Sequence, residues 1–203
     1  MRARHDVAMA VTLMTVCTGN ICRSPYAHLT LQAALEQVRP GAFEVSSAGT
    51  GALIDNPVDP GSAHILDARG VAHEEFRARQ ISESMLDDVD IVLPLEVSHR
   101  KAVLSHSPRH LKRAFTLKEF ARLLDSADER EPWMQRLAGL TTPEERWAAL
   151  PSHLARERGL SRVADGADDI ADPYRQPQEV FDQMAREVDA AVERIVAFER
   201  QFA

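Results

Sequence analysis

Hydrophobic and polar positions along the chain predict strands that alternate with amphipathic helices. Residues 11–16 form a run of apolar and β-branched side chains that is long enough for one buried strand. A serine followed by a proline opens segment 24–38, in which apolar residues recur at spacings of three and four. That order is typical of a helix with its N-cap at Ser24. A second helix is predicted over 59–70, from an Asp-Pro start to a glycine C-cap.

Three further segments have strand character: 43–45, 89–94 and, more weakly, 113–117. Segment 98–104 is predicted to be helical. Apolar residues over 181–202 recur at helical spacing and predict a C-terminal amphipathic helix of about 25 residues. Strands that alternate with helices in this way predict an α/β fold with a parallel sheet.

Segment 125–167 fits this alternation poorly, because it is charged and contains three prolines. It still carries helical signals, since Thr142 and Glu145 form a capping box around a proline at the first helical position. Apolar residues follow on one face, and Pro151 is expected to divide that helix. We therefore predict one domain over residues 1–203, with a helical insertion at about 125–167.

Length and charge narrow the function classes. A chain of 203 residues suits a single domain, with or without an insertion. Asp and Glu number 31 against 24 Lys and Arg, and this formal net charge of −7 makes a general nucleic-acid binder a poor candidate. No stretch of the sequence approaches the ~20 apolar residues that a membrane span needs. We therefore expect neither a nucleic-acid partner nor membrane insertion.

The N-terminal segment is interpreted as a buried strand rather than as a secretory signal. Basic residues precede the apolar run 7–16, but that run leads directly into a polar motif without a small-residue cleavage site. The cytoplasm is therefore the expected compartment. Met9 directly precedes the first strand, so both Met1 and Met9 are candidate starts, and residues 1–8 are expected to be an extension of no structural consequence.

The chain has two cysteines, Cys17 and Cys22, which indicate no disulfide framework. They cannot complete a four-ligand zinc site without distant histidines. His106 and His110 have helical spacing, but Pro108 between them disfavours a shared helical face. No metal site is expected.

The first strand meets the first helix at Val-Cys-Thr-Gly-Asn-Ile-Cys-Arg-Ser-Pro, residues 16–25. A turn of this kind aims backbone amides and a helix N-terminus at one point, which suits an anion. The same positive field favours the thiolate form of a cysteine. Five residues separate Cys17 from Arg23, so the turn pairs a thiol nucleophile with a planar guanidinium that can hold two phosphate oxygens.

A Cys-x5-Arg spacing alone also occurs by chance, and a cysteine after a strand is usually a small buried hydrophobe. Here a glycine, a serine and a following proline accompany it between a predicted strand and a predicted helix. Nucleotide-binding P-loops share that context but require G-x-x-x-x-G-K-[ST], which this sequence lacks. The joint pattern favours phosphate chemistry at Cys17.

Segment 16–25 resembles the signature of low-molecular-weight protein tyrosine phosphatases. Segments 45–50, 56–60, 78–81 and 172–174 resemble later parts of the same family in the same order. The first match is highly specific, and the others are weak one by one. The resemblance implies a four-stranded parallel sheet in the order 2-1-3-4 with helices on both faces, and no metal or organic cofactor.

The resemblance also implies a role for each residue of the loop. Cys17 would attack phosphorus, Arg23 would hold the phosphoryl oxygens, and Asp172 would protonate the leaving phenolate and then activate water. The Asp-Pro-aromatic match selects Asp172, since Asp168 and Asp169 would otherwise be equal candidates. The remaining substrate-binding residues implied are Thr18, Gly19, Asn20, Ile21, Cys22 and Ser24.

Two of these residues would support the loop. Asn20 would fix its shape, often through a partner at Ser47, and Ser24 would hydrogen-bond to the Cys17 sulfur. Members of the family often have a histidine at position 76 that braces the asparagine, and Phe76 stands here instead. The supporting polar network is therefore in doubt, although the nucleophile is not.

Other departures concern the surroundings of the loop. The segment 93–96 lacks the Met-Asp or Met-Thr that the family usually has after its third strand. Leu53 or Ala52 stands where many relatives place an aromatic residue on the pocket rim, so a modest affinity for phosphotyrosine is expected. The segment 125–167 is longer than the family's usual connection.

These observations predict a cytoplasmic phosphatase that acts on a phosphotyrosine protein or a small aryl phosphate through a phosphocysteine, with a cognate tyrosine kinase as a candidate partner. One alternative is an arsenate reductase on the same scaffold, although that chemistry usually needs further cysteines. Another alternative is a non-catalytic phosphate-binding module, which Phe76 and the altered end of the third strand leave open.

Overall fold

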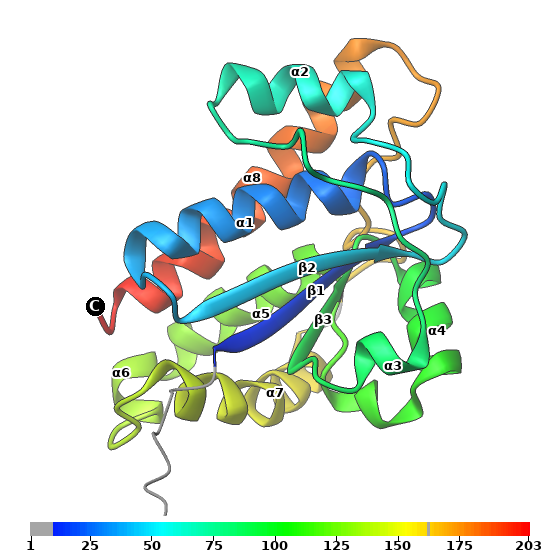
Figure 1. Ribbon diagram of the computed structural model, residues 1–203. Helices are drawn as coiled ribbons and strands as arrows, with labels where there is room; N and C mark the ends of the chain where they lie inside the picture. The colour runs from blue at the N-terminus through cyan, green and yellow to red at the C-terminus, as the bar shows by residue number, and fades with distance from the viewer. Residues whose placement is uncertain (1–9, 162) are drawn as a thin grey trace, which may run out of the picture.

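Three parallel strands form the sheet at the centre of the fold, in the order β2-β1-β3 (Figure 1). The computed structural model describes residues 10–161 and 163–203, and the expected extension over 1–8 lies outside them. β1 (Val11–Cys17) pairs along its whole length with β2 (Phe43–Gly49) and over residues 13–16 with β3 (Ile91–Pro94). These strands confirm the first three that were predicted, and their carboxyl ends meet at one edge of the sheet.

The connections between and after the strands are mostly helical. The described helices are α1 (Arg23–Val38), α2 (Pro60–Ala68), α3 (Glu83–Leu86), α4 (Val97–His106), α5 (Leu117–Arg130), α6 (Trp133–Arg136), α7 (Pro143–Leu160) and α8 (Gln178–Arg200), with a 3₁₀ turn, η1 (Pro108–Lys112), before α5. Over the described part of the chain, none of these helices combines the length and the apolar character that a membrane crossing needs.

The fourth strand predicted over 113–117 does not form within the described residues, so the expected four-stranded sheet of order 2-1-3-4 is wrong. A single bridge joins Val92 to Ala114. The Ala114 amide donates to the carbonyl of His110 at 2.8 Å, an α-helical turn that follows the 3₁₀ turn η1, and Thr116 already caps α5. Too little extended backbone remains between these two helical ends for a strand.

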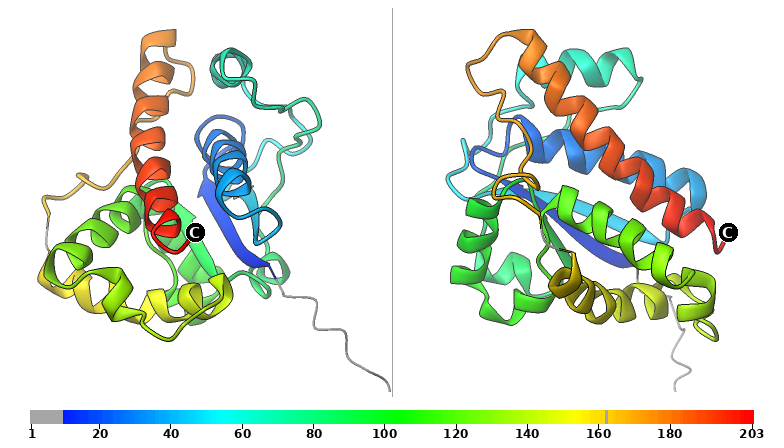
Figure 2. Two further views of the ribbon diagram at one scale, coloured as in Figure 1. Left: turned by 90° about the vertical axis from the view of Figure 1, so that its left-hand side faces the viewer. Right: turned by 180° about the vertical axis from the view of Figure 1, so that it is seen from behind.

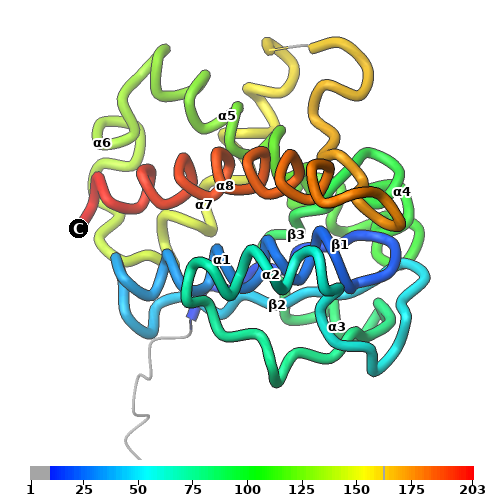
Figure 3. Tube along the Cα trace, turned by 90° about the horizontal axis from the view of Figure 1, so that it is seen from above, coloured from blue at the N-terminus to red at the C-terminus, as the bar shows by residue number. Residues whose placement is uncertain are grey.

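Helices pack on both faces of the sheet (Figure 2). The alternation of side chains along β1 assigns Leu13 to the larger core, with α1, α5 and α8, and Met14 to a smaller one. In the smaller core, Leu86 of α3 and Val103 of α4 cover the opposite face. Figure 3 shows α8 lying between α1 and α5, both of which it contacts.

The first helix begins two residues earlier than predicted and is not capped by Ser24. α1 starts at Arg23, and its N-cap is Cys22, whose side chain makes no capping hydrogen bond. The Ser24 side chain is buried, and its hydroxyl contacts the sulfur of Cys17 instead. The Ser-Pro pair therefore supports the loop before the helix rather than the helix end.

α7 continues through Pro151, so the predicted division of this helix is wrong, whereas the predicted capping box of Thr142 and Glu145 is confirmed. Proline removes one backbone hydrogen bond from a helix interior. Trp147 before Pro151 and Leu154 after it are both buried in the core, and this packing holds the two halves in one helix. The interpretation of segment 125–167 as an insertion stays a prediction.

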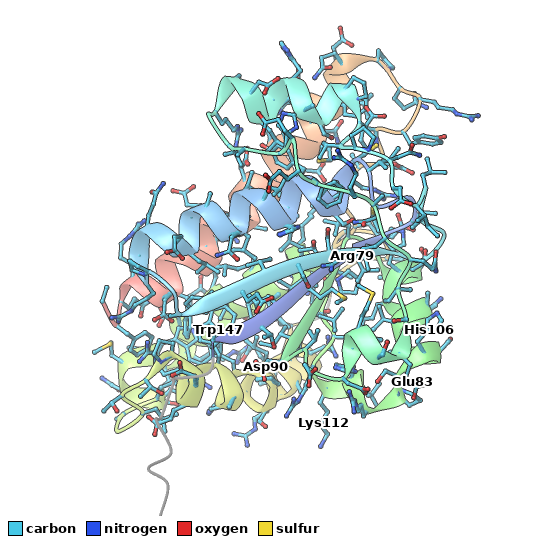
Figure 4. The ribbon with its side chains drawn as sticks, viewed as in Figure 1. Arg79, Glu83, Asp90, His106, Lys112 and Trp147 are labelled. Carbon is cyan, nitrogen blue, oxygen red and sulfur yellow. The ribbon has the colours of Figure 1, made fainter. Side chains whose placement is uncertain are left out.

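A buried carboxylate, Glu199 of α8, holds α7 in place. Its oxygens accept hydrogen bonds from Arg146 at 2.5 Å, from the Trp147 indole at 2.9 Å and from Arg39 of the α1 C-cap at 3.1 Å. Glu199 has no exposed surface and Arg146 has almost none. Figure 4 shows Trp147 at the end of the sheet opposite the carboxyl ends of the strands.

Replacing Glu199 with alanine should lower the free energy of unfolding by about 3–5 kcal/mol, because it leaves the buried guanidinium of Arg146 without a counter-charge. Chemical denaturation measures the change. Glu193→Ala on the exposed side of the same helix is the matched control and should change stability by less than about 0.5 kcal/mol. Equal stability of the two variants would show that the buried cluster does not hold α7.

Candidate active site

The loop between β1 and α1 is held from outside by its carbonyl groups. The amide of Thr50 donates to the carbonyl of Cys17 at 2.9 Å, and the amide of Gly51 donates to that of Thr18 at 3.0 Å. The amide of Leu53 donates to the carbonyl of Gly19 at 3.0 Å. The segment that follows β2 therefore draws these carbonyls away from the centre of the loop, which leaves the loop amides for an anion.

Asn20 occupies the tightest point of the loop. Its φ of 53° lies in the left-handed region, which asparagine tolerates better than most residues. The side chain is buried, and its amide nitrogen donates to the hydroxyls of Ser24 at 2.9 Å and Ser47 at 3.0 Å. Its amide oxygen accepts from the backbone of Arg79 at 2.9 Å. Figure 4 shows Arg79 beside the carboxyl end of β2.

The Cys17 sulfur lies 3.0 Å from the hydroxyl oxygen of Ser24, and both side chains are buried. Because Ser24 already accepts a hydrogen bond from Asn20, its own proton is free to be donated to sulfur. Such a donor favours the thiolate form. The second cysteine, Cys22, differs: burial first, and the negative charge of Asp59 next, raise its pKa, so Cys22 stays a neutral thiol.

The guanidinium of Arg23 lies between two carboxylates. One terminal nitrogen is 2.6 Å from Glu96 and also donates to the carbonyl of Ile170 at 3.4 Å. The other terminal nitrogen is 3.1 Å from Asp172. Only 3% of the Arg23 side chain is exposed, whereas 54% of Asp172 is exposed. Arg23 is therefore fixed in orientation, and its contact with Asp172 is open to a competing anion.

Glu96 and His99 are part of this site, and the sequence analysis did not assign either of them a role. The Nε2 atom of His99 is 2.9 Å from the Thr18 hydroxyl and 3.7 Å from Glu96. Burial, with a smaller contribution from Arg23, lowers the pKa of His99 to about 4, so its ring is neutral near pH 7. Glu96 is the second residue after the end of β3, where parallel sheets place their ligand-binding residues, and that position was the available signal.

The carboxylate of Glu96 is ionised. Burial opposes its ionisation, but hydrogen bonds from Ser98 and Arg23, together with the positive charge of Arg23, outweigh burial and lower the pKa of Glu96. The Glu96 charge therefore balances that of Arg23 in the absence of a ligand.

A cavity of about 180 Å³ opens above the loop. Its lining residues are Cys17, Thr18, Gly19, Ile21, Cys22, Arg23, Gly51, Leu53, Asp172 and Tyr174. The structure thus brings seven of the nine predicted site residues to one cavity, while Asn20 and Ser24 lie buried behind them. Leu53 and Tyr174 are about two-fifths exposed, at 39% and 41%, and form an apolar rim.

Asp168 and Asp169, the two alternatives to Asp172 as general acid, form hydrogen bonds with other groups. Asp168 is bound through both oxygens by Arg122, at 3.1 and 2.7 Å. Asp169 accepts from the backbone of Val97 at 2.8 Å. Of these three carboxylates, only Asp172 lines the cavity with Cys17.

Comparison with known proteins places these features in a family. Residues 12–139 match the family described as low molecular weight phosphotyrosine protein phosphatase. A probable low molecular weight protein-tyrosine-phosphatase, EpsP of Ralstonia nicotianae, is 34% identical over 129 residues, which are 64% of this chain and 83% of that protein.

Solved structures share the fold. The crystal structure of a low molecular weight protein tyrosine phosphatase from T. tengcongensis superposes with a TM-score of 0.65 at 24% identity, covering 93% of this chain and 99% of that one. An arginine phosphatase, YwlE from Geobacillus stearothermophilus, superposes with a TM-score of 0.61 at 24% identity, covering 92% and 91%.

Arg23→Lys should weaken the binding of inorganic phosphate by about 10-fold or more, although the charge is kept. A lysine ammonium cannot reproduce the planar fork that contacts Glu96 through one terminal nitrogen and offers the other, now beside Asp172, to an anion. Each charge-assisted hydrogen bond is worth about 1.5–3 kcal/mol. Calorimetric titration measures the dissociation constant. Arg109→Lys, in an exposed ion pair with Asp87, is the control. Unchanged phosphate affinity of Arg23→Lys would exclude Arg23 from the anion site.

Proposed function

Because the chain belongs to the low molecular weight phosphotyrosine protein phosphatase family, we propose that it hydrolyses phosphotyrosine or a small aryl phosphate through a phosphocysteine at Cys17. The observation that carries this mechanism is the meeting of Cys17, Arg23 and Asp172 in one cavity, with the Ser24 hydroxyl 3.0 Å from the sulfur. Each of these groups supplies one requirement of phosphoryl transfer to a thiol.

The phosphate would be held by donors that exist before it arrives. The loop carbonyls point outward, so the amides of residues 18–23 can surround three phosphoryl oxygens, and Arg23 adds a planar pair of donors. An incoming dianion competes with the exposed Asp172 for Arg23. Asp172, released from Arg23, is then free to act on the leaving group.

The first chemical step forms one bond and breaks another. The Cys17 thiolate attacks phosphorus, the phosphorus–oxygen bond to the aryl group breaks, and the proton of Asp172 passes to the departing phenolate oxygen. The products of this step are a phenol, the phosphocysteine and an ionised Asp172.

The second step restores the enzyme. The ionised Asp172 takes a proton from water, the water oxygen attacks phosphorus, and the bond between phosphorus and the Cys17 sulfur breaks. The sulfur leaves as a thiolate, which the Ser24 hydroxyl stabilises at 3.0 Å. Inorganic phosphate is released, and Asp172 again carries a proton.

The rim supports an aromatic substrate. Leu53 and Tyr174 offer apolar surface on the cavity, and Tyr174 has one face covered by Arg175, whose guanidinium carbon is 5.0 Å from the ring centroid. A phenyl ring entering between these side chains would bring its phosphate to Cys17. We therefore infer a phosphotyrosine protein or a small aryl phosphate as substrate, and a tyrosine kinase as the enzyme that supplies the former.

The compartment and the domain boundary follow as part of the same proposal. Cys17 and Cys22 are both free, and a thiol nucleophile persists in a reducing compartment, so we infer the cytoplasm. We also infer a single phosphatase domain with a helical insertion at 125–167, because Asp172 and Tyr174 return to the cavity after it, although the family match ends at residue 139.

Substrate competition tests the proposed activity. The purified chain should hydrolyse p-nitrophenyl phosphate and a phosphotyrosine peptide, and should not consume thiols when arsenate is added. Phosphoarginine is included as a competing substrate, since one protein of the same fold is an arginine phosphatase. Faster turnover of phosphoarginine, or arsenate-dependent thiol consumption without phosphate release, would contradict the proposal. Phosphate binding without any turnover would also contradict it and would favour a non-catalytic phosphate-binding module.

Cys17→Ser should abolish hydrolysis while phosphate or vanadate still binds. A serine hydroxyl is far less ionised than a thiol, and loss of a nucleophile typically costs about 10⁴-fold or more in kcat. Steady-state assays with p-nitrophenyl phosphate measure the loss, and Cys22→Ser is the matched control for cysteine replacement. Substantial activity in Cys17→Ser would show that another group attacks phosphorus.

Asp172→Asn should slow hydrolysis in proportion to the basicity of the leaving group. A general acid contributes about 10²–10⁴-fold to the rate and helps most where the departing oxygen is basic. The kcat for phosphotyrosine should therefore fall far more than the kcat for an activated aryl phosphate. The measurement is the slope of log kcat against the pKa of the leaving phenol. Asp169→Asn keeps an oxygen for the Val97 amide and is the control. A wild-type slope in Asp172→Asn would exclude it as the acid.

A further inference from the structure

A chain of hydrogen bonds runs from the Cys17 sulfur to a histidine on the second turn of α1. Cys17 contacts Ser24, Ser24 accepts from Asn20, and Asn20 also donates to Ser47. The Ser47 hydroxyl oxygen in turn lies 3.3 Å from the Nδ1 atom of His28. The mechanism above does not use this histidine.

The direction of each hydrogen bond follows from the groups involved. The amide nitrogen of Asn20 is only a donor, so the oxygens of Ser24 and Ser47 must both accept from it. The proton of Ser24 is then free for the Cys17 sulfur. The proton of Ser47 needs a different acceptor, because Ser47 is fully buried and an unpaired hydroxyl there is unfavourable. The Nδ1 atom of His28 is the side-chain acceptor within reach.

His28 is suited to accept. Burial, and next the positive charge of Arg79, lower the pKa of His28 to about 4, so the ring is neutral near pH 7. A neutral imidazole has one nitrogen without a proton, and that nitrogen accepts when it is Nδ1. Phe76 packs edge-on against the ring, with the centroids 6.3 Å apart, and thereby limits its rotation.

We propose that His28 is a positioning residue that orients the Ser47 hydroxyl, and through Ser47 and Asn20 the Ser24 hydroxyl, toward the thiolate of Cys17. His28 touches neither the cavity nor the substrate, so its effect must reach the sulfur through three side chains. The functional consequence rests on the proposed role of Cys17 as nucleophile. The same hydrogen bonds should also set the ease with which Cys17 ionises in the free protein.

The test compares His28→Leu with His28→Asn. Leucine removes the acceptor, whereas the side-chain oxygen of asparagine is as many bonds from the backbone as Nδ1. We expect His28→Leu to lower kcat by about 3- to 10-fold with little change in KM, as for the loss of one hydrogen bond. The pH profile of Cys17 alkylation by iodoacetate, located by peptide mass spectrometry, should move to higher pH. His28→Asn should restore both readouts to within about 2-fold.

Matched controls separate this role from general destabilisation. His64→Leu makes the same replacement at an exposed position of α2 and should leave both readouts unchanged. Ser47→Ala should reproduce the effect of His28→Leu, and the double variant should be no worse than either single one, because both break the same chain. If His28→Leu does not fold, the pH profile of Cys17 alkylation in Ser47→Ala tests the proposal instead.

Three results would overturn the proposal: a wild-type alkylation profile in a folded His28→Leu or Ser47→Ala, an Asn variant as impaired as the Leu variant, or fully additive effects of His28→Leu and Ser47→Ala. The alkylation readout does not depend on catalysis. A wild-type chain without phosphatase activity would therefore contradict the proposed function, while a shifted alkylation profile in His28→Leu would still support the positioning role.

Discussion

The buried side chain of Asn20 is the constraint on which the site depends. Its φ of 53° turns the chain sharply, and its amide group joins three separate parts of the fold: Ser24 at the start of α1, Ser47 on β2 and the backbone of Arg79. Both serine partners are fully buried. Loss of the amide would leave several polar groups unpaired away from water, at about 1–3 kcal/mol each. The loop is therefore shaped before any anion arrives, which is the condition for electrostatic stabilisation without reorganisation.

The sequence predicted the loop well because its chemistry is local. Cys17, Arg23 and Ser24 lie within eight consecutive residues between a strand and a helix, so their order along the chain already sets their geometry. The same reasoning failed at Ser24, which was expected to cap α1 and instead contacts the sulfur. Serine before proline is typical of a helix start, but the burial of its hydroxyl beside a thiol is a tertiary contact that propensity does not contain.

The errors in the sheet have a similar origin. Segment 113–117 has strand-forming residues, yet Thr116 and Glu119 form a capping box, and apolar residues at helical spacing follow it in α5. That local signal was available and outweighs the β-propensity of so short a run. The supports of the site, by contrast, could not be predicted: His99 meets Thr18 across 81 residues and His28 meets Ser47 across 19. Phe76 left the brace of the loop in doubt, and the contact of His28 with Ser47 supplies a polar partner from α1 instead.

Two clusters of arginine and carboxylate differ in the burial of their carboxylates, and this difference decides whether each cluster stabilises the fold or binds a ligand. Glu199 is inaccessible to solvent and binds Arg146, so no ligand can replace it, and the cluster fixes α7 against α8 at one end of the sheet. At the carboxyl ends of the strands Arg23 is as buried as Arg146, but its partners Glu96 and Asp172 are 27% and 54% exposed. Water can solvate these carboxylates when an anion displaces them, so exchange costs far less there. The difference in exposure of the carboxylates, rather than of the arginines, makes one cluster permanent and leaves the other open to phosphate.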